Sequence, residues 1–309
     1  MQKNRKTAFH MRLWRNLHTN PYLYLMAIPV VVYFIIFQYI PIYGNVIAFK
    51  QFIPAEGIWG SQWVGLKHFV DFFNSYYFFR LLRNTLLLSI YSLVFSFPLP
   101  ILFALLINEL RNKRFKKITQ TITYIPHFIS IMVVCGMVID FTSKSGVIND
   151  LIEWFGGERK TFLLYPQNFR SIYILTGIWQ ETGWSSIIYL SALSAIDVSL
   201  YEAAEIDGAG RLRQTWNITL PSIMPTIIIL LILRIGSMMN IGFEKIILLY
   251  NSNTYETADV ISTFIYRRGI LGLAYSYSSA VGLFNSIINF SLLVFANMLS
   301  RKFRGSGLF

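Results

Sequence analysis

The sequence predicts an all-α membrane protein with six transmembrane helices and with both termini in the cytoplasm. Three observations support this class. Of the 309 residues, 54% are apolar and only 14% are charged, which is less charge than a soluble domain carries. Six apolar runs are long enough to cross the ~30 Å hydrocarbon core of a bilayer. Lysine and arginine are also divided unequally between the two sets of connecting loops.

The six apolar runs define the expected spans. They also place a transmembrane domain over residues 21–309, behind a basic tail at 1–20. The first run is too long for the apolar part of a signal peptide, so it is expected to remain as the first span. Prolines inside several runs are compatible with membrane helices. The predicted spans cover about residues 21–42, 85–107, 121–141, 171–195, 223–249 and 277–299.

The distribution of lysine and arginine predicts the orientation. Fifteen of them lie in the N-terminal tail, the loop between spans two and three, the loop at 197–221 and the C-terminal tail. Ten lie in the three longer loops on the other side. Because cytoplasmic loops are the richer in positive charge, both termini and the 197–221 loop are expected in the cytoplasm. The net charge of +12 then reflects topology rather than nucleic-acid binding.

The first outer loop, from Trp63 to Asn84, is rich in aromatic side chains. It is expected to form an amphipathic helix on the membrane surface. Direct contact with a partner protein is the alternative.

The polar loop at 197–221 is expected to fold as two short helices. Ser199 and Glu202 have the spacing of a capping box, which predicts a helix start. Gly208 and Gly210 then predict a break, because glycine accepts the backbone conformations of a tight turn.

One face of the first short helix carries small side chains. Leu200, Ala203, Ala204 and Asp207 follow helical spacing, so both alanines lie on this face. Small side chains bury little apolar area but let another surface approach the backbone closely. The loop therefore suits docking into a groove of a partner. A solvated loop, or one packed on the chain's own helices, is the alternative.

Polar and aromatic residues inside the fourth and fifth runs predict a substrate path, because ionisable groups within a membrane usually face a cavity or a partner. Aromatic faces with amide or carboxylate groups suit a sugar. Alternatives are tryptophan packing against lipid, a structural ion pair between Arg234 and Glu181, and packing hydrogen bonds from His127. The candidate path residues are Gln180, Glu181, Trp184, Arg234, Asn240 and Glu244.

Several classes of activity lack support in the sequence. There is no phosphate-binding G-x-x-x-x-G-K-[ST] loop, so energy from ATP has to come from another polypeptide. The sequence offers no nucleophile–base pair that would indicate an enzyme. The four histidines are scattered and the cysteine is single, so neither a metal site nor an intrachain disulfide is expected. A stand-alone secondary transporter or channel is a weaker alternative, because no inverted repeat is apparent.

The 197–221 loop also resembles the EAA signature of ABC-importer permeases. Glu202, Ala203 and Ala204 are followed by three residues and Gly208, and then by nine intervening residues and Ile218-x-Leu-Pro. The chain around this motif is similar to type I, maltose-transporter-like permeases for oligosaccharides and complex glycans. The stretches that carry the similarity are Tyr39–Phe52, Trp63–Phe69, Gln120–Ser130, Gly242–Asn251 and Glu256–Gly269.

The resemblance implies a complete importer. It implies a type I permease fold in the plasma membrane, a second related permease, two ATPase subunits that bind ATP and Mg, and an extracytoplasmic binding protein. No cofactor is implied in this chain. The coupling role falls on Glu202, Ala203, Ala204 and Gly208, next to Asp207. Glu244 and Lys245 could alternatively pair with the companion permease. A permease for another solute class is the nearest alternative, and Arg234 with Lys245 hint at an acidic sugar.

Overall fold

The computed structural model describes residues 19–304, which divide into two compact units at residues 68 and 69. Positions 1–18 of the predicted basic tail lie outside the described residues. The first unit begins with a long helical segment and ends in a small hairpin. Its elements are α2 (Pro21–Phe34), a π-helical stretch (Ile35–Tyr39), α3 (Ile40–Tyr43), a 3₁₀ stretch (Gly44–Phe49), β1 (Lys50–Gln51), α4 (Gly57–Gly60) and β2 (Gln62–Trp63).

The hairpin of the first unit is held by hydrogen bonds at Lys50. Strands β1 and β2 are antiparallel, with Lys50 opposite Trp63. The Lys50 ammonium donates to the Ile58 carbonyl at 2.7 Å, and the Lys50 carbonyl lies 3.1 Å from Nε2 of His68. Within this unit α2 exposes apolar side chains along its whole length, which suits contact with lipid.

The amphipathic surface helix expected over 63–84 is not formed. The segment contains strand β2, helix α5 (Lys67–Phe73), a turn, and the start of helix α6 at Phe78. Phe72 is almost fully buried. The aromatic side chains therefore contribute partly to a core, because the turn after α5 folds them back on neighbouring helices.

The second unit, described over residues 69–304, consists of helices of very different lengths. The longest are α11 and α18, and short helices connect the others. After α5 come α6 (Phe78–Tyr91), α7 (Pro98–Glu109), α8 (Lys113–Tyr124), α9 (Ile131–Thr142), α10 (Val147–Trp154), α11 (Pro166–Ser194), α12 (Val198–Ile206), α13 (Arg211–Gln214), α14 (Leu220–Gly236), α15 (Phe243–Leu249), α16 (Tyr255–Ala258), α17 (Ile261–Ile265) and α18 (Tyr275–Arg304).

The described residues contain five helical segments long and apolar enough to cross a membrane, or six if α11 and α12 count as one bent pair. These two helices meet at a bend of 69°. The second and sixth predicted spans correspond to continuous helical segments at Phe78–Glu109 and Tyr275–Lys302. The third and fifth predicted spans are each interrupted by a break in the helix.

The break in the third predicted span falls at Pro126. Helix α8 ends at Tyr124, a 3₁₀ turn covers Ile125–Phe128, and α9 begins at Ile131. Proline lacks a backbone N–H and clashes with the preceding turn, which favours an interruption. The Ser130 hydroxyl then accepts a hydrogen bond from the Val133 amide and starts the next helix.

Three π-helical stretches each end two residues before a proline. They cover Ile35–Tyr39 before Pro41, Ser92–Ser96 before Pro98, and Thr215–Thr219 before Pro221. A proline cannot donate the usual helical hydrogen bond, so the turn before it widens instead of ending the helix. Residues Arg211–Gly236 consequently form one helical segment, which begins earlier than the predicted fifth span.

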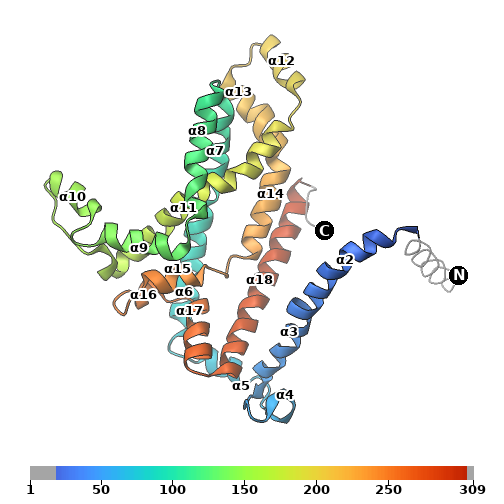
Figure 1. Cartoon of the computed structure of the whole chain (residues 1–309), viewed down its shortest axis with the longest axis vertical. Coiled ribbons are helices and arrows are strands. Elements are labelled where there is room, and N and C mark those ends of the chain that lie inside the picture. The colour runs from blue at the N-terminus through green and yellow to red at the C-terminus, as the bar shows by residue number, and fades with distance from the viewer. Residues whose placement is uncertain (1–18, 305–309) are drawn as a thin grey trace. The chain divides into compact units, whose positions relative to one another are not determined.

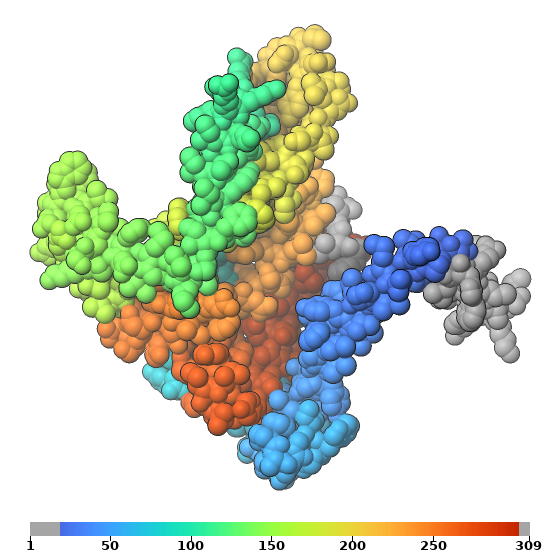
Figure 2. Space-filling view, viewed as in Figure 1, coloured from blue at the N-terminus to red at the C-terminus, as the bar shows by residue number. Residues whose placement is uncertain are grey.

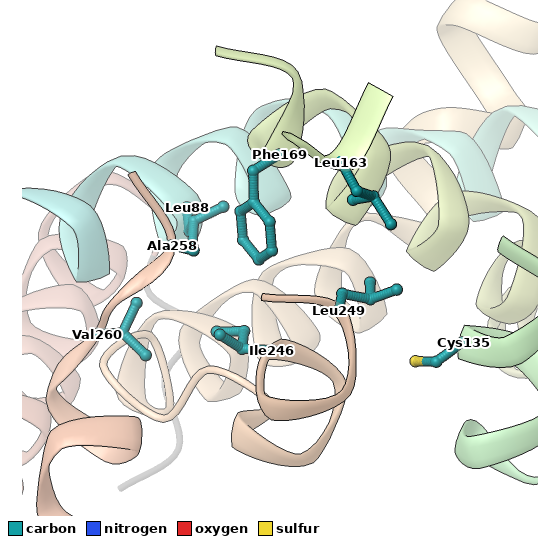
Figure 3. Close-up of a cluster of buried hydrophobic side chains, with 8 residues drawn as sticks. All are labelled: Leu88, Cys135, Leu163, Phe169, Ile246, Leu249, Ala258 and Val260. Carbon is teal, nitrogen blue, oxygen red and sulfur yellow. The ribbon is translucent and has the colours of Figure 1, made fainter. Parts of the chain in front are cut away.

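The core beside the site is built from five helices and the connections between them. Figure 3 shows this cluster, in which side chains from α6, α9, α11, α15 and α16 converge with one from the 3₁₀ turn at Phe162–Leu164 and one from the connection before α17. Burial of such apolar side chains is the main stabilising contribution to the packing. The cluster consists of Leu88, Cys135, Leu163, Phe169, Ile246, Leu249, Ala258 and Val260.

Close helix packing next to the site depends on Gly183 of α11. A Cβ at this position would lie less than 3.0 Å from the backbone carbonyl of Thr123 on α8. Only glycine permits this approach of the two backbones, so α8 and α11 pack at very short range.

The two ends of the second unit carry different structures. Helix α12 lies at the tip of one end, whereas α16 and α17 lie toward the other end (Figure 1). The space-filling view shows the same tip around α12, and a separate lobe formed around α10 (Figure 2).

A buried carboxylate ties helices together at the α17 end. The fully buried side chain of Asp259 accepts hydrogen bonds from the Arg267 guanidinium at 2.7 and 3.2 Å and from Arg80 at 3.5 Å. Thr263 donates to the same carboxylate at 2.9 Å. Paired and hydrogen-bonded in this way, a buried charge is tolerated.

Candidate functional site

A cavity of about 1060 Å³ lies among helices α6, α7, α11 and α14, and the segment that follows α14. Its wall combines aliphatic side chains with serine, amide and charged groups. All six residues predicted for a substrate path line this one cavity: Gln180, Glu181, Trp184, Arg234, Asn240 and Glu244.

The α11 wall presents the predicted face of polar and aromatic groups. Gln180 and Trp184 are one helical turn apart and both line the cavity, as their spacing indicates. Gln180 is buried, and its amide donates to the Ile129 carbonyl at 3.3 Å, a backbone group left free by the break before α9. The neighbouring Trp179 is half exposed and does not line the cavity.

Trp184 is held by a side chain from the broken third span. The His127 ring stacks on the indole with centroids 4.5 Å apart and an angle of 3° between the planes. Nδ1 of His127 also lies 3.1 Å from a carboxylate oxygen of Glu181. His127 thus acts as a packing hydrogen-bonder, and it fixes both a tryptophan and a carboxylate of the cavity wall.

The fifth predicted span is broken at the cavity. Helix α14 ends at Gly236 and α15 begins at Phe243, so residues 237–242 are not helical, contrary to the single span expected over 223–249. Asn240 lies in this segment, and its Oδ1 accepts bonds from the amides of Asn285 and Asn289, each at 3.0 Å.

Two more bonds satisfy the backbone groups that the break leaves free. The side-chain oxygen of Asn289 accepts from the buried Met239 amide at 2.8 Å. The Ser89 hydroxyl donates to the Met238 carbonyl. Unwound backbone inside a membrane is tolerated where protein groups or a cavity satisfy it, and both conditions hold for this segment.

The cationic side chains of the cavity do not form the alternative ion pair between Arg234 and Glu181. The Arg234 guanidinium donates to the Ser92 hydroxyl at 2.6 Å, whereas Glu181 contacts His127. Lys245 is 7% exposed, and its ammonium donates to the Tyr173 carbonyl at 2.7 Å.

The first helix of the predicted docking loop begins two residues earlier than its capping box indicated. Asp197, not Ser199, caps α12: its carboxylate accepts a bond from the Ser199 amide at 2.9 Å. That bond holds the pKa of Asp197 below its ordinary value. Ser199 lies inside the helix, because an aspartate two residues before it offers the stronger acceptor for the free amides.

The predicted break at Gly208 is confirmed. Helix α12 ends at Ile206, and Gly208 has a φ of +74°, in the left-handed region that favours glycine. Glu202, Ala203 and Asp207 are exposed, and Ala204 is partly buried. Ile206 is 88% exposed, so the helix presents apolar surface that no residue of the described chain covers.

Three residues that shape the site are not among the six candidates predicted from the sequence. His127 was interpreted only as a packing residue, and Lys245 was not included among the path residues. Tyr173 carried no signal, because an aromatic residue in an apolar run is ordinary. The proline before His127 and the charge of Lys245 inside an apolar run were the available signals.

The fold and the cavity together define a polytopic membrane protein of the transport class, with a polar-walled cavity among its helices. Residues 96–305 match the family model described as binding-protein-dependent transport system inner membrane component. The chain belongs to this family of ABC-importer permeases. It is therefore a multi-pass membrane protein.

Known proteins resemble the chain over nearly its whole length. The polygalacturonan/rhamnogalacturonan transport system permease protein YteP of Bacillus subtilis (strain 168) is 49% identical, over 96% of this chain and 93% of YteP. A solved bacterial ABC transporter involved in the import of the acidic polysaccharide alginate contains a chain that is 47% identical, with a TM-score of 0.88, over 95% of this chain and 99% of that one.

A second solved structure extends the comparison to an assembly. It is a bacterial alginate ABC transporter in complex with an alginate pentasaccharide-bound periplasmic protein. Its matching chain is 47% identical with a TM-score of 0.88, over 96% of this chain and 100% of that one. The predicted type I importer permease fold is confirmed by these similarities.

Proposed function

We propose that this chain forms part of the translocation path for an oligosaccharide. The observation that carries the proposal is the single cavity lined by all six candidate residues. The similarity of this chain to permeases for polygalacturonan/rhamnogalacturonan and for alginate supports a carbohydrate as the substrate over other solute classes.

The chemistry of the wall suits a sugar. The Trp184 indole offers an apolar face for sugar C–H groups. Around it, the wall supplies the amide of Asn240, the hydroxyl of Ser92 and the carboxylate of Glu244, which can bond sugar hydroxyls. A cavity of about 1060 Å³ is at the upper end of ordinary ligand sites, so it accommodates a chain of several sugar units.

The EAA loop is proposed to couple this path to ATP hydrolysis on the cytoplasmic side. The distribution of positive charge predicts that this loop and both termini lie in the cytoplasm. The exposed Glu202, Ala203 and Ile206 of α12 provide a surface for an ATPase subunit, with Gly208 setting the turn. We expect such partners to bind ATP and Mg, because the sequence contains no phosphate-binding G-x-x-x-x-G-K-[ST] loop.

The full importer is proposed to contain this chain, a second permease, two ATPase subunits and an extracytoplasmic binding protein. The similar alginate transporter, solved with its periplasmic protein, supports that composition. Closure of the ATPases shifts the permeases between two states only because the coupling contacts differ between these states.

Replacing Trp184 by Ala tests the path. We expect lower oligosaccharide uptake in proteoliposomes that contain the whole importer, with basal ATPase activity unchanged, because the substitution removes a stacking face from the cavity. Trp179→Ala, on the same helix but outside the cavity, is the matched control. Equal uptake in the Trp184→Ala and wild-type importers would assign Trp184 to packing alone.

Replacing Glu202 by Lys tests the coupling surface. The change reverses an exposed charge on α12 and leaves the membrane helices untouched. The complex should still assemble and insert, but uptake should no longer depend on ATP hydrolysis. Normal transport by the purified variant complex would contradict the assignment.

A further inference from the structure

The cavity contains two cationic side chains that no carboxylate of the described chain neutralises. The ion pairs formed within residues 19–304 include neither Arg234 nor Lys245. Lys245 is buried, whereas Arg234 is exposed and lines the cavity. For Lys245, a charge withdrawn from water without a counter-charge is strongly unfavourable. Ionisable groups at membrane depth usually have a functional reason.

Lys245 is held in place at the cavity wall, although it lacks a counter-charge. It lies on α15, directly after the break in the fifth span, and is 7% exposed. Its ammonium donates to the Tyr173 carbonyl at 2.7 Å and lies 4.4 Å from the centre of the Tyr173 ring. These contacts orient the ammonium and occupy one of its three donors, so donors remain for another acceptor.

Arg234 approaches the same region from the other side of the break. It lies in the last turn of α14, and one guanidinium nitrogen donates to Ser92. Arg234, Lys245 and Tyr173 all line the same cavity. The remaining N–H groups form a planar fork, a geometry that matches a carboxylate.

The acidic groups of the cavity do not serve as the missing partners. Glu181 attracts Lys245 electrostatically but lies beyond ion-pair distance, and its carboxylate contacts His127. Glu244 is exposed and forms no ion pair within the described chain. The wall therefore presents two cations without an ion-pair partner in the described chain, together with a carboxylate in contact with a histidine.

We propose that Arg234 and Lys245 form a carboxylate subsite that selects oligosaccharides containing uronate residues. The proposal rests on the proposed function of the cavity and specifies its substrate class. A uronate carboxylate brought by the substrate supplies the counter-charge that the chain lacks. Ser92 and Tyr173 position the two cations, and the tryptophan face of the cavity holds the sugar ring.

The test compares an acidic oligosaccharide with its neutral counterpart. Tetragalacturonate and an alginate tetrasaccharide serve as acidic probes, and the neutral forms are the same chains with each carboxyl reduced to a primary alcohol. Binding to the purified importer is measured without the binding protein, so that the selectivity of that protein does not contribute. Uptake by wild-type proteoliposomes identifies which acidic probe is used.

The variants remove or conserve the charge at each position. Lys245→Met and Arg234→Gln remove it, and Lys245→Arg keeps it. Lys144→Met removes an exposed cation from the loop between α9 and α10, outside the cavity, and is the matched control. Basal ATPase activity and co-purification of all subunits show that each variant assembles.

We expect Lys245→Met and Arg234→Gln each to raise the Kd of the acidic probe by roughly tenfold or more, the range of a charge-assisted hydrogen bond. The Kd of the neutral form should change less than about twofold. Lys245→Arg should retain most of the affinity for the acidic probe, and Lys144→Met should match wild type.

Three results would overturn the subsite. Equal loss of affinity for acidic and neutral probes would assign the two cations to structure. Loss of the companion permease on purification of a variant would also assign them to structure, as an ion pair across the interface between the permeases. Unchanged affinity for both probes would remove the cations from the site while leaving the oligosaccharide path intact. Failure of the wild-type importer to take up any oligosaccharide would instead refute the proposed function.

Discussion

Replacing Asn289 by Leu should loosen the break in the fifth span. Asn289 lies on α18, where its side-chain oxygen accepts from the Met239 amide at 2.8 Å and its amide donates to Oδ1 of Asn240 at 3.0 Å. Leucine has a similar size, so the change removes both bonds without opening a large void.

The magnitude follows from what is left unpaired. Met239 is 1% exposed, so its amide has no access to water after the substitution. An unsatisfied buried donor costs about 1–3 kcal/mol. The lost bond between membrane helices adds about 0.6 kcal/mol. Together these terms predict a loss of about 1.6–3.6 kcal/mol in the free energy of unfolding.

The assay is thermal unfolding of the purified importer in detergent, combined with uptake in proteoliposomes. The midpoint should fall by several degrees, and uptake should fall because the released segment at 237–242 lines the cavity. Ser291→Ala is the matched control on the same helix, since its hydroxyl bonds only the Ile287 carbonyl of its own helix. A midpoint equal to that of the control would refute this explanation of how the break is held.

Three further outcomes are expected. Gly208→Val should uncouple uptake from ATP hydrolysis without blocking insertion, because φ of +74° strains a β-branched residue; tight coupling in the purified variant would contradict this. Gly183→Val should prevent the close approach of α11 to Thr123. This overpacking should lower the free energy of unfolding by about 1–3 kcal/mol, and with it the unfolding midpoint; a midpoint like that of wild type would show that the helices can separate freely. Asp259→Ala should destabilise the complex by about 3–5 kcal/mol, because Arg267 loses its buried partner; an unchanged unfolding midpoint would show that the pair is dispensable.

The α11 wall of the site could be predicted because it depends on one helix. Helical periodicity alone places Gln180 and Trp184 on the same side, and the structure confirms that both line the cavity. The stacking of His127 on Trp184 could not be predicted, since it depends on how two separate spans pack. The local signal beside His127 is the proline that breaks the third span. That proline indicates an interruption of the helix but not the partner of the histidine.

The break in the fifth span was not visible in the hydropathy pattern. Residues 237–242 continue an apolar run and contain no proline, so the pattern predicts one helix over 223–249. The helix ends at Gly236 because partners on other helices, Asn285, Asn289 and Ser89, compensate the freed polar groups. An interruption that depends on distant partners leaves no local signature.

The sequence by itself determined the membrane class, the approximate number of spans, the turn at Gly208 and the list of polar residues inside the apolar runs. These follow from composition, period and local backbone preference, which act over a few residues. The tertiary structure decided which of those polar groups meet. It paired Glu181 with His127 rather than Arg234, and it left Arg234 and Lys245 beside one cavity without an ion-pair partner among residues 19–304. The physical reason is that charge neutralisation within a membrane depends on packing between helices, which the chain settles only when it folds.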